Sequence, residues 1–359
     1  MITKQNGHDY KSVAFLAHWV ESWNWLLWWV KDLHKHPENV KRWCWLWPVY
    51  FLASVMYLIG NKPFNIVDRF IFKTKDLDDD QIGGLTVLLR NFGWHFFLPM
   101  YREKIRQRIL ATVLAIQDQV DVIGLGALAK DERVTQGGKW IVDQLGDRLR
   151  KPIVHGDTLT ATAVLHQILA VLDKYSIKSP VFLTGSTSKI GRVVSIGLAQ
   201  RDIKVMMYTQ DEGRFKSIAE EAGAFAGNLK RTEFLSDGNS CSLWVTGKAI
   251  PSGADLYKYI PRGAVVMNFS VPNPLKKRDF RIRLDIRPYE GGLLAYNPEK
   301  ASLQFTMRLK PGLIYACYAG AFVHCHQSWI HHEIGSVDMS KLDEVWNVAE
   351  EIGFFLPPI

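Results

Sequence analysis

The chain has 359 residues, of which 47% are hydrophobic, enough to build the cores of two domains. Its formal net charge of +8 favours anionic partners such as nucleotide phosphates, acidic carrier proteins or anionic lipid head groups. No zinc knuckle, recognition-helix motif or RNP-like strand accompanies this charge, so nucleic acid is not an expected partner. The four cysteines lack the spacing of a disulfide framework, and the first ten residues lack the apolar core of a signal peptide. A reducing, cytosolic setting is therefore expected.

Tryptophan is concentrated at the N-terminus. Eight of the thirteen tryptophans precede residue 48: Trp19, Trp23, Trp25, Trp28, Trp29, Trp43, Trp45 and Trp47. Indole rings favour the bilayer interface, and residues 43–60 carry no charge and would reach about 27 Å as a helix. Residues 1–90 are therefore predicted to form an aromatic, membrane-associating helical region on the cytoplasmic face of a membrane. The alternative is a helical hairpin buried against the rest of the protein.

A first α/β lobe is predicted over residues 91–178. Ile105, Ile109, Val113 and Ile116 define one face of a helix over 101–119, whose first turns carry basic residues that either hold an acidic partner or are solvated. Strands are predicted at 120–127, which has a glycine-rich exit at Gly126, and at 151–156. Asp157 and Thr158 are then predicted to cap a long apolar helix that runs to about Asp173. This lobe is expected to position the substrate, with Gly126, Asp157 and Thr158 as its candidate site residues.

The stretch from Pro180 to Ala199 is an apolar strand, a glycine turn and the start of a helix, the order in which a dinucleotide-binding unit presents backbone N–H groups to a pyrophosphate. Gly185 and Gly191 stand at the first and third positions of the glycine fingerprint, with Ser188 at the middle one. Further strands are predicted at 203–208, 243–247 and 263–268. Residues 179–300 are thus predicted to be a Rossmann-like, doubly wound NAD(P)-binding domain, the alternative being an α/β core that binds no ligand. Its candidate cofactor residues are Gly185, Ser186, Thr187, Ser188, Lys189, Ile190, Gly191 and Arg214.

Cofactor choice depends on the end of the second strand of this domain. Asp211 lies there and can hold a ribose hydroxyl, whereas Arg214 can bind a 2′-phosphate.

The C-terminal segment, 301–359, carries the candidate nucleophile and is expected to return to the substrate lobe. Cys317 lies among small and apolar residues, where a cysteine is either a thiolate nucleophile or a small hydrophobe. Histidines and a glutamate crowd positions 324–333, yet no three of them have an established metal-ligand spacing, so no metal site is expected. His324 is a candidate for the same cleft.

From about Phe92 onward, the chain resembles the cyanobacterial long-chain acyl-ACP (acyl carrier protein) reductases and, more closely, the C-terminal half of plant eceriferum-type wax biosynthesis proteins. The shared stretches are 122–127, 154–159, 184–191, Ala316-Cys-Tyr-Ala-Gly320 and Trp329-Ile-His-His-Glu-Ile-Gly335. Around Asn61 the chain resembles the plant proteins as well, although their di-iron histidine boxes are absent. Where the cyanobacterial family has a glutamate, this chain has Gly320.

The resemblance implies a reductase that converts a long-chain acyl thioester, on acyl carrier protein or coenzyme A, to the fatty aldehyde with NADPH. Cys317 would carry the acyl group as a thioester, and His324 would substitute for the missing glutamate in proton transfer. An aldehyde-consuming enzyme would be a partner in wax or alkane metabolism. Two alternatives remain open: a catalytically idle NAD(P)-binding scaffold in a membrane complex, and a soluble hydroxy-acid dehydrogenase.

Overall fold

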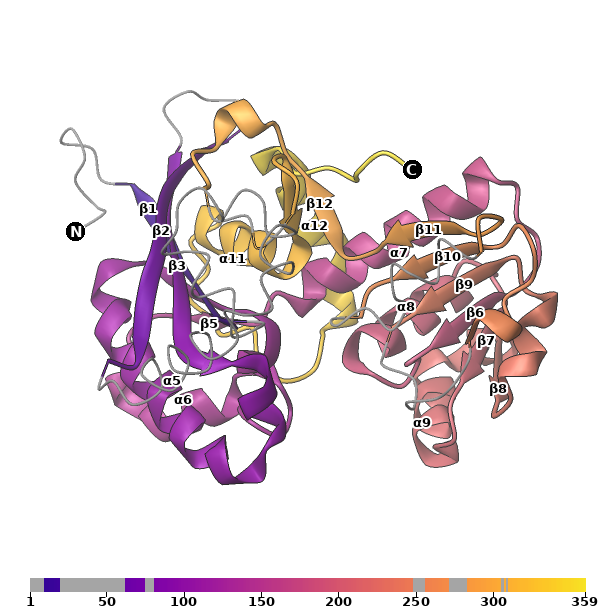
Figure 1. Cartoon of the computed structure of the whole chain (residues 1–359), viewed down its shortest axis with the longest axis horizontal. Helices are drawn as coiled ribbons and strands as arrows, with labels where there is room; N and C mark the ends of the chain where they lie inside the picture. The colour runs from indigo at the N-terminus through magenta and orange to yellow at the C-terminus, as the bar shows by residue number, and fades with distance from the viewer. Residues whose placement is uncertain are drawn as a thin grey trace, which may run out of the picture. The chain divides into compact units, whose positions relative to one another are not determined.

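The computed structural model describes residues 10–19, 62–74, 81–247, 256–270, 283–304, 307 and 309–359. The chain divides into two compact units, each of which contains a β-sheet flanked by helices (Figure 1). Unit 1 comprises Met1–His155, Asn297–Arg308 and Ala321–Gly335, and unit 2 comprises Gly156–Tyr296, Leu309–Gly320 and Ser336–Ile359. The chain thus contributes three separate segments to each unit.

Unit 1 is built on a five-stranded sheet in the order β2-β3-β1-β4-β5. Its strands are β1 (Lys11–Trp19), β2 (Phe64–Lys73), β3 (Gln81–Phe92), β4 (Val122–Leu125) and β5 (Ile153–Val154). Only β2 is antiparallel to its neighbour. Helices cover both faces of the sheet. The apolar stripe of α5 (Arg102–Ile116) and that of α6 (Lys139–Leu145) pack on one face, where Ile105, Ile109, Val113 and Ile116 are fully buried as predicted.

The other face of the unit 1 sheet packs against the second part of helix α11 (Ala316–His326). Gly124 on β4 makes this close approach possible, because a Cβ there would lie 2.9 Å from the Cβ of Ala321. The ring of Phe322 contacts Phe70 and Phe72 of β2, with centroids 5.9 and 5.3 Å away. Central strands buried on both sides need continuous apolar sequence, which β1 supplies.

The prediction of a helical region over residues 1–90 is wrong for the part of it that the structure describes. Residues 11–19, 64–73 and 81–92 are strands, and β1 lies in the middle of the sheet. Trp19 is buried in this core rather than placed for a bilayer interface. The other seven N-terminal tryptophans and the run 43–60 lie outside the described residues. No helix in the described ranges is long and apolar enough to span a bilayer.

Unit 2 contains a six-stranded parallel sheet in the order β11-β10-β9-β6-β7-β8. The strands are β6 (Val181–Thr184), β7 (Val205–Tyr208), β8 (Leu229–Thr232), β9 (Leu243–Thr246), β10 (Val265–Asn268) and β11 (Arg287–Glu290). Counted from β6, this is the order 3-2-1-4-5-6 of a doubly wound dinucleotide-binding sheet. The predicted Rossmann-like topology is confirmed, and β8 and β11 are added to it.

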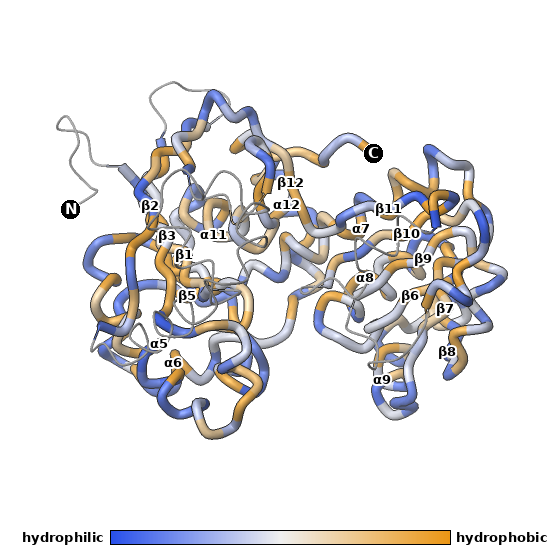
Figure 2. Tube along the Cα trace, viewed as in Figure 1, coloured by the Kyte–Doolittle hydropathy of each residue, from blue (hydrophilic) through white to orange (hydrophobic). Residues whose placement is uncertain are grey.

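Successive side chains along each strand point to opposite faces of the sheet, so each face has its own apolar core. The central strands of the sheet are coloured as apolar in Figure 2. Val181 and Leu183 join the core beneath α7 (Asp157–Lys174), α8 (Lys189–Ala199) and α9 (Glu212–Ala222). Phe182, between them, points to the opposite core, where it packs on Trp244 with ring centroids 4.2 Å apart. Unit 2 is completed by the β12 (Leu293–Ala295) and β13 (Leu313–Tyr315) pair and by α12 (Leu342–Ile352).

Candidate functional site

The turn between β6 and α8 has the geometry of a phosphate-binding loop. Gly185 has φ of +65°, which an L side chain rarely adopts. Ser188 is the N-cap of α8, and its Oγ accepts a hydrogen bond from the backbone N–H of Gly191 at 3.2 Å. A Cβ on Gly191 would lie 2.2 Å from the carbonyl oxygen of Gly185. Position 191 therefore requires glycine, as the fingerprint interpretation expected, while the serine at the middle position is the helix cap.

Two buried hydroxyls flank this turn. Thr184 ends β6 and Ser186 follows Gly185, and both side chains are almost completely buried. Among the described residues, the Thr184 Oγ1 and Ser186 Oγ atoms have no hydrogen-bond partner. Buried hydroxyls are normally paired, so two unpaired ones beside a helix N-terminus fit a site that receives polar atoms from a ligand. The turn thus meets the requirements of a dinucleotide pyrophosphate.

The turn also lies at the switch point of the sheet. From β6 the chain continues towards β7 and β8, whereas from β9 it continues towards β10 and β11, on the other side. Ligands of open α/β sheets bind where the carboxyl ends of two such strands diverge. Beside this point Thr246 Oγ1 donates to Asn268 Oδ1 at 3.1 Å, and Asn268 Nδ2 donates to Glu290 Oε2 at 3.2 Å. These three side chains form a polar row at the ends of β9, β10 and β11 that no motif in the sequence indicates.

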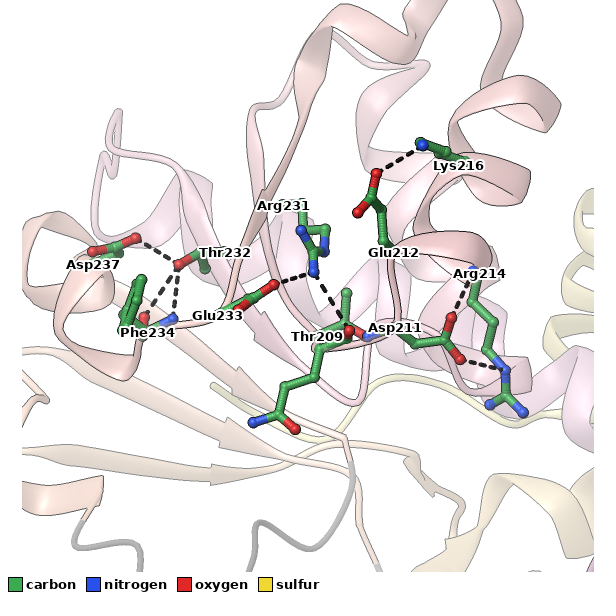
Figure 3. A network of polar contacts seen from close by, with 11 residues as sticks. Thr209, Asp211, Glu212, Arg214, Lys216, Arg231, Thr232, Glu233, Phe234 and Asp237 are labelled. Atoms are coloured by element: carbon green, nitrogen blue, oxygen red, sulfur yellow. Dashed lines mark hydrogen bonds and ion pairs between the residues drawn. The ribbon is translucent and has the colours of Figure 1, made fainter.

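Asp211 and Arg214 form a pair at the start of α9 (Figure 3). Asp211 is the N-cap residue, and its Oδ1 accepts from the backbone N–H of Arg214 at 2.9 Å. Its Oδ2 lies 3.3 Å from Arg214 Nε, and both side chains are more than half exposed. The helix cap fixes the carboxylate, whereas the guanidinium is free to exchange partners with an incoming phosphate. Both residues lie after β7, where the sequence placed them.

Arg231 on β8 adds a second cation at this edge. Figure 3 shows its guanidinium between Glu233 and the turn that precedes α9, and its Nη2 donates to the carbonyl oxygen of Gln210 at 3.4 Å and pairs with Glu233. Lys216 pairs with Glu212 at 2.7 Å, and this hydrogen bond lowers the pKa of the Glu212 carboxyl. Three cations, Arg214 and Lys216 on α9 and Arg231 on β8, are thus each paired with a carboxylate near the start of α9. Of these three cations, only Arg214 was a candidate from the sequence.

Cys317 lies in the first turn of α11, is partly exposed and is a free thiol. It packs against the turn that precedes α7. A Cβ on Gly156 would lie 2.2 Å from the Cys317 carbonyl oxygen, and one on Gly320 would lie 2.9 Å from the Gly156 Cα. This glycine-to-glycine contact explains why no glutamate occupies position 320, because the larger side chain has no room there. The nucleophilic role of Cys317 stays a prediction.

His324 is buried on the same helix, two turns beyond Cys317, about 10.5 Å along the axis at 1.5 Å per residue. Its Nε2 lies 2.8 Å from the carbonyl oxygen of His331, to which it donates. Burial lowers the pKa of His324 to about 4, so the ring is neutral near pH 7. These contacts anchor the segment that follows α11, and a role in proton transfer for His324 stays a prediction. Within the described ranges, no three His, Cys, Asp or Glu side chains are placed to share a metal ion.

His155 and Glu333 form a pair that the sequence analysis did not identify. His155 is fully buried at the end of β5, and its Nδ1 lies 3.1 Å from Glu333 Oε1. The two backbones are also paired, because His155 N donates to Glu333 O and Glu333 N donates to Ile153 O, both at 2.9 Å. The segment after α11 therefore extends the sheet of unit 1. Both residues lie in stretches that carried the family resemblance, but their pairing joins positions far apart in sequence.

The three residues predicted for a substrate lobe fall in different units. Gly126 directly follows β4 in unit 1, where its N–H donates to the Leu16 carbonyl oxygen at 2.7 Å and an added Cβ would lie 2.5 Å from the Phe15 ring. Asp157 and Thr158 are buried in the first turn of α7 in unit 2, and the N-cap itself is Gly156. The structure thus gives Gly126 a packing role within its own unit.

A cavity of about 640 Å³ opens in unit 1, with Lys11, Asp121, Lys151 and Trp329 among its lining residues. It lies at the amino ends of β1, β4 and β5. Ligands of parallel α/β sheets bind at the carboxyl ends instead, so this cavity is not a candidate for the site.

Residues 181–356 match the family described as CER1-like, C-terminal domain. The rice protein named very-long-chain aldehyde decarbonylase GL1-2 (Oryza sativa subsp. indica) is 32% identical over 273 residues, which are 73% of this chain and 40% of that protein. The rice GL1-1 protein of the same name is 29% identical over 315 residues, 85% of this chain and 46% of that protein. The chain therefore spans less than half the length of these curated relatives.

The tryptophan dehydrogenase of Nostoc punctiforme, a solved structure, aligns with 96% of this chain and 81% of its own, with a TM-score of 0.40 and 10% sequence identity.

These relatives correct the expected function. A very-long-chain aldehyde decarbonylase consumes an aldehyde, whereas the expected acyl-thioester reductase would form one, so the prediction of an aldehyde-forming acyl-ACP or acyl-CoA reductase is wrong. The resemblance to the plant wax proteins is confirmed, and the one to the acyl-ACP reductases is not. Residues 181–356 of this chain are similar to a CER1-like C-terminal domain, and the chain is homologous to the rice very-long-chain aldehyde decarbonylases.

Proposed function

We propose that unit 2 binds a nicotinamide dinucleotide across the carboxyl edge of its six-stranded sheet, and that the chain supplies this site in the metabolism of very-long-chain aldehydes. The observation that carries the proposal is the glycine turn at the switch point of a 3-2-1-4-5-6 sheet. An α/β core that binds no ligand would not require Gly191 to lie so close to the Gly185 carbonyl oxygen.

The residues of the turn have distinct roles in this proposal. The backbone N–H groups at the start of α8 face the pyrophosphate, and the helix dipole favours its negative charge. The hydroxyls of Thr184 and Ser186 gain partners that they lack among the described residues. Asp211 and Arg214 lie where the adenosine ribose is bound in such sheets. When bound, the dinucleotide supplies a nicotinamide ring that accepts or donates a hydride.

The phosphorylated cofactor, NADPH, is the preferred form in this proposal. Arg214 is exposed and its present partner, Asp211, is held independently by the helix cap. A 2′-phosphate can therefore take over the guanidinium without unfolding the turn. An NADH ribose would instead meet a carboxylate that is already engaged with the arginine.

The substrate class in this proposal comes from the rice relatives, whose names specify very-long-chain aldehydes. Because the chain covers less than half of those proteins, we propose that it supplies the nucleotide-binding part of such a system. The aldehyde is a substrate of that system, in contrast to the aldehyde product of a reductase.

Isothermal titration of the full chain with NADPH and with NADH tests the binding site. Gly191→Leu is expected to abolish binding, because the side chain would fill the space beside Gly185. Gly227→Ala is the matched control, since an added Cβ there has no atom within 4 Å. A folded Gly191→Leu variant that binds NADPH like the wild type would exclude this turn from the site.

The aldehyde part of the proposal needs a separate measurement. The full chain is incubated with a very-long-chain aldehyde, with and without NADPH, and the remaining aldehyde and its products are followed by gas chromatography and mass spectrometry. Nucleotide-dependent loss of the aldehyde supports a catalytic role. Binding of NADPH without any loss of aldehyde would reduce the chain to a nucleotide-binding component.

A further inference from the structure

Unit 1 displays an uninterrupted run of exposed apolar residues between β3 and α5. Phe97, Leu98 and Met100 are 53%, 37% and 79% exposed, and Pro99 between them is exposed as well. Trp94, one turn earlier, is 46% exposed. We name residues 94–100 the apolar turn. Its two short 3-10 helices, Gly93–Phe97 and Pro99–Tyr101, turn these side chains outward.

The apolar turn is held in place by a buried histidine beneath it. His95 is fully buried, and its Nδ1 accepts a hydrogen bond from the backbone N–H of Phe92 at 3.0 Å. Trp94 stacks on the His95 ring with centroids 3.6 Å apart, and Tyr101 meets the same ring edge-on at 4.9 Å. A contiguous group of apolar side chains is thus held exposed to water at a cost in solvation, which indicates a partner.

Cations border the apolar turn. Arg102 and Lys104, in the first turn of α5, are exposed and form no ion pair with any residue that the structure describes. Positive charge at a helix N-terminus opposes the helix dipole, so these two side chains do not stabilise α5. Arg133 lies over the Phe97 ring, 5.5 Å from its centroid, while pairing with Asp131 at 3.1 Å. The chain as a whole is also basic, with a formal net charge of +8.

We propose that the apolar turn inserts into the surface of an anionic lipid bilayer, with Arg102 and Lys104 on the head groups. Exposed tryptophan and phenylalanine next to cations are what a bilayer interface accommodates, with rings at head-group depth and charges on anionic lipids. A stable protein–protein interface of ordinary size would need a larger apolar surface than the apolar turn provides. The lipid contact involves unit 1 alone and does not require the nucleotide site.

Co-sedimentation of the full chain with lipid vesicles tests the proposal. Vesicles of phosphatidylcholine are compared with vesicles that also contain phosphatidylserine. The double variant F97S/M100S is expected to weaken binding to the mixed vesicles by at least about tenfold, the factor that corresponds to 1.4 kcal/mol. The double variant R102Q/K104Q is expected to remove the preference for phosphatidylserine. The matched control is Phe234→Ser in unit 2, because Phe234 is 67% exposed but lies outside the apolar turn.

Hydrogen exchange locates the contact directly, since residues 93–101 are expected to exchange more slowly when vesicles are present. Three results would overturn the proposal: no binding of the wild type to either vesicle, equal binding of F97S/M100S and the wild type, or a change in oligomeric state caused by F97S/M100S without lipid. The second result would place membrane contact elsewhere in the chain. The third would identify a second copy of the chain as the occupant. Equal thermal midpoints of variant and wild type exclude misfolding as the cause of lost binding.

Discussion

Three buried histidines predict that unit 1 loses stability in mild acid. Burial lowers the pKa values of His18, His95 and His324 to about 4 in the folded chain, against an ordinary value of 6.5. Protonation of His18 is opposed locally as well, because its Nε2 accepts a hydrogen bond from the Leu128 N–H at 3.3 Å. A second proton on His18 would place two donors face to face at this nitrogen.

The sign of the effect follows from where each state binds protons. In the unfolded chain the three imidazoles protonate near pH 6.5, whereas in the folded chain they protonate only near pH 4. Lowering the pH through this window therefore favours the unfolded state, at 1.36 kcal/mol per pH unit for each histidine. Each histidine costs about 2 kcal/mol by pH 5 and about 3 kcal/mol by pH 4. Together they approach the whole stability of an ordinary domain.

Urea-induced unfolding followed by circular dichroism at about pH 7.5 and about pH 5 measures this loss. In His324→Gln the amide can still donate to the His331 carbonyl, but it cannot be protonated, so the variant should lose about 2 kcal/mol less than the wild type over this range. His326→Gln, on the same helix and partly exposed, is the control and should follow the wild type. Equal stability of the wild type at both pH values, or equal losses in His324→Gln and the wild type, would refute the reasoning.

Three further substitutions have defined outcomes. Arg214→Ala should weaken NADPH binding about tenfold and leave NADH binding nearly unchanged, because the 2′-phosphate loses a charge-assisted partner. The control Lys216→Ala, on the same helix, should change the affinity for neither cofactor. Equal losses of affinity for both cofactors in a titration of Arg214→Ala would show that Arg214 does not discriminate between them. Gly320→Glu should prevent stable folding or lower the free energy of unfolding by several kcal/mol, since even a Cβ there would lie 2.9 Å from the Gly156 Cα. A thermal midpoint equal to that of the wild type would contradict this packing. Trp244→Ala should cost about 3–5 kcal/mol in urea unfolding, because the ring is fully buried, and a loss under 1 kcal/mol would show that the core collapses around it.

The parts of the fold that rest on local pattern were predictable from sequence. The apolar stripe of α5 and the strand, turn and helix around Gly185 appear at the expected positions, since periodicity and glycine placement are local properties. The strand β8 has no such signal, because Lys230 and Arg231 occupy its middle and are not buried. The N-terminal strands were misassigned because the concentration of tryptophans favoured a bilayer interface. In the structure, the run Val13–Ala17 of β1 is apolar because both faces of the strand are covered. A continuous apolar run does not distinguish a doubly covered strand from a membrane-associated helix.

The site shows the same division. The spacing of Gly185, Ser188 and Gly191 was sufficient to place the glycine turn between β6 and α8. Pairings between distant segments, such as His155 with Glu333 and Thr246 with Asn268, depend on which strands become neighbours. Sequence spacing carries no information on such neighbours, so these residues were found only in the structure.

The distribution of each unit over three segments has a consequence for synthesis. In unit 1, Glu333 pairs with Val154 of β5, and Phe322 packs on Phe72 of β2. The strands β1 to β5 are translated long before these two residues. The sheet of unit 1 therefore cannot be completed until residues up to Gly335 have left the ribosome, whereas domains usually fold in order as they emerge. Until then its sheet has one apolar face without a cover. Chaperones that bind nascent chains should consequently hold this protein late, and removing its last forty residues should leave neither unit able to fold.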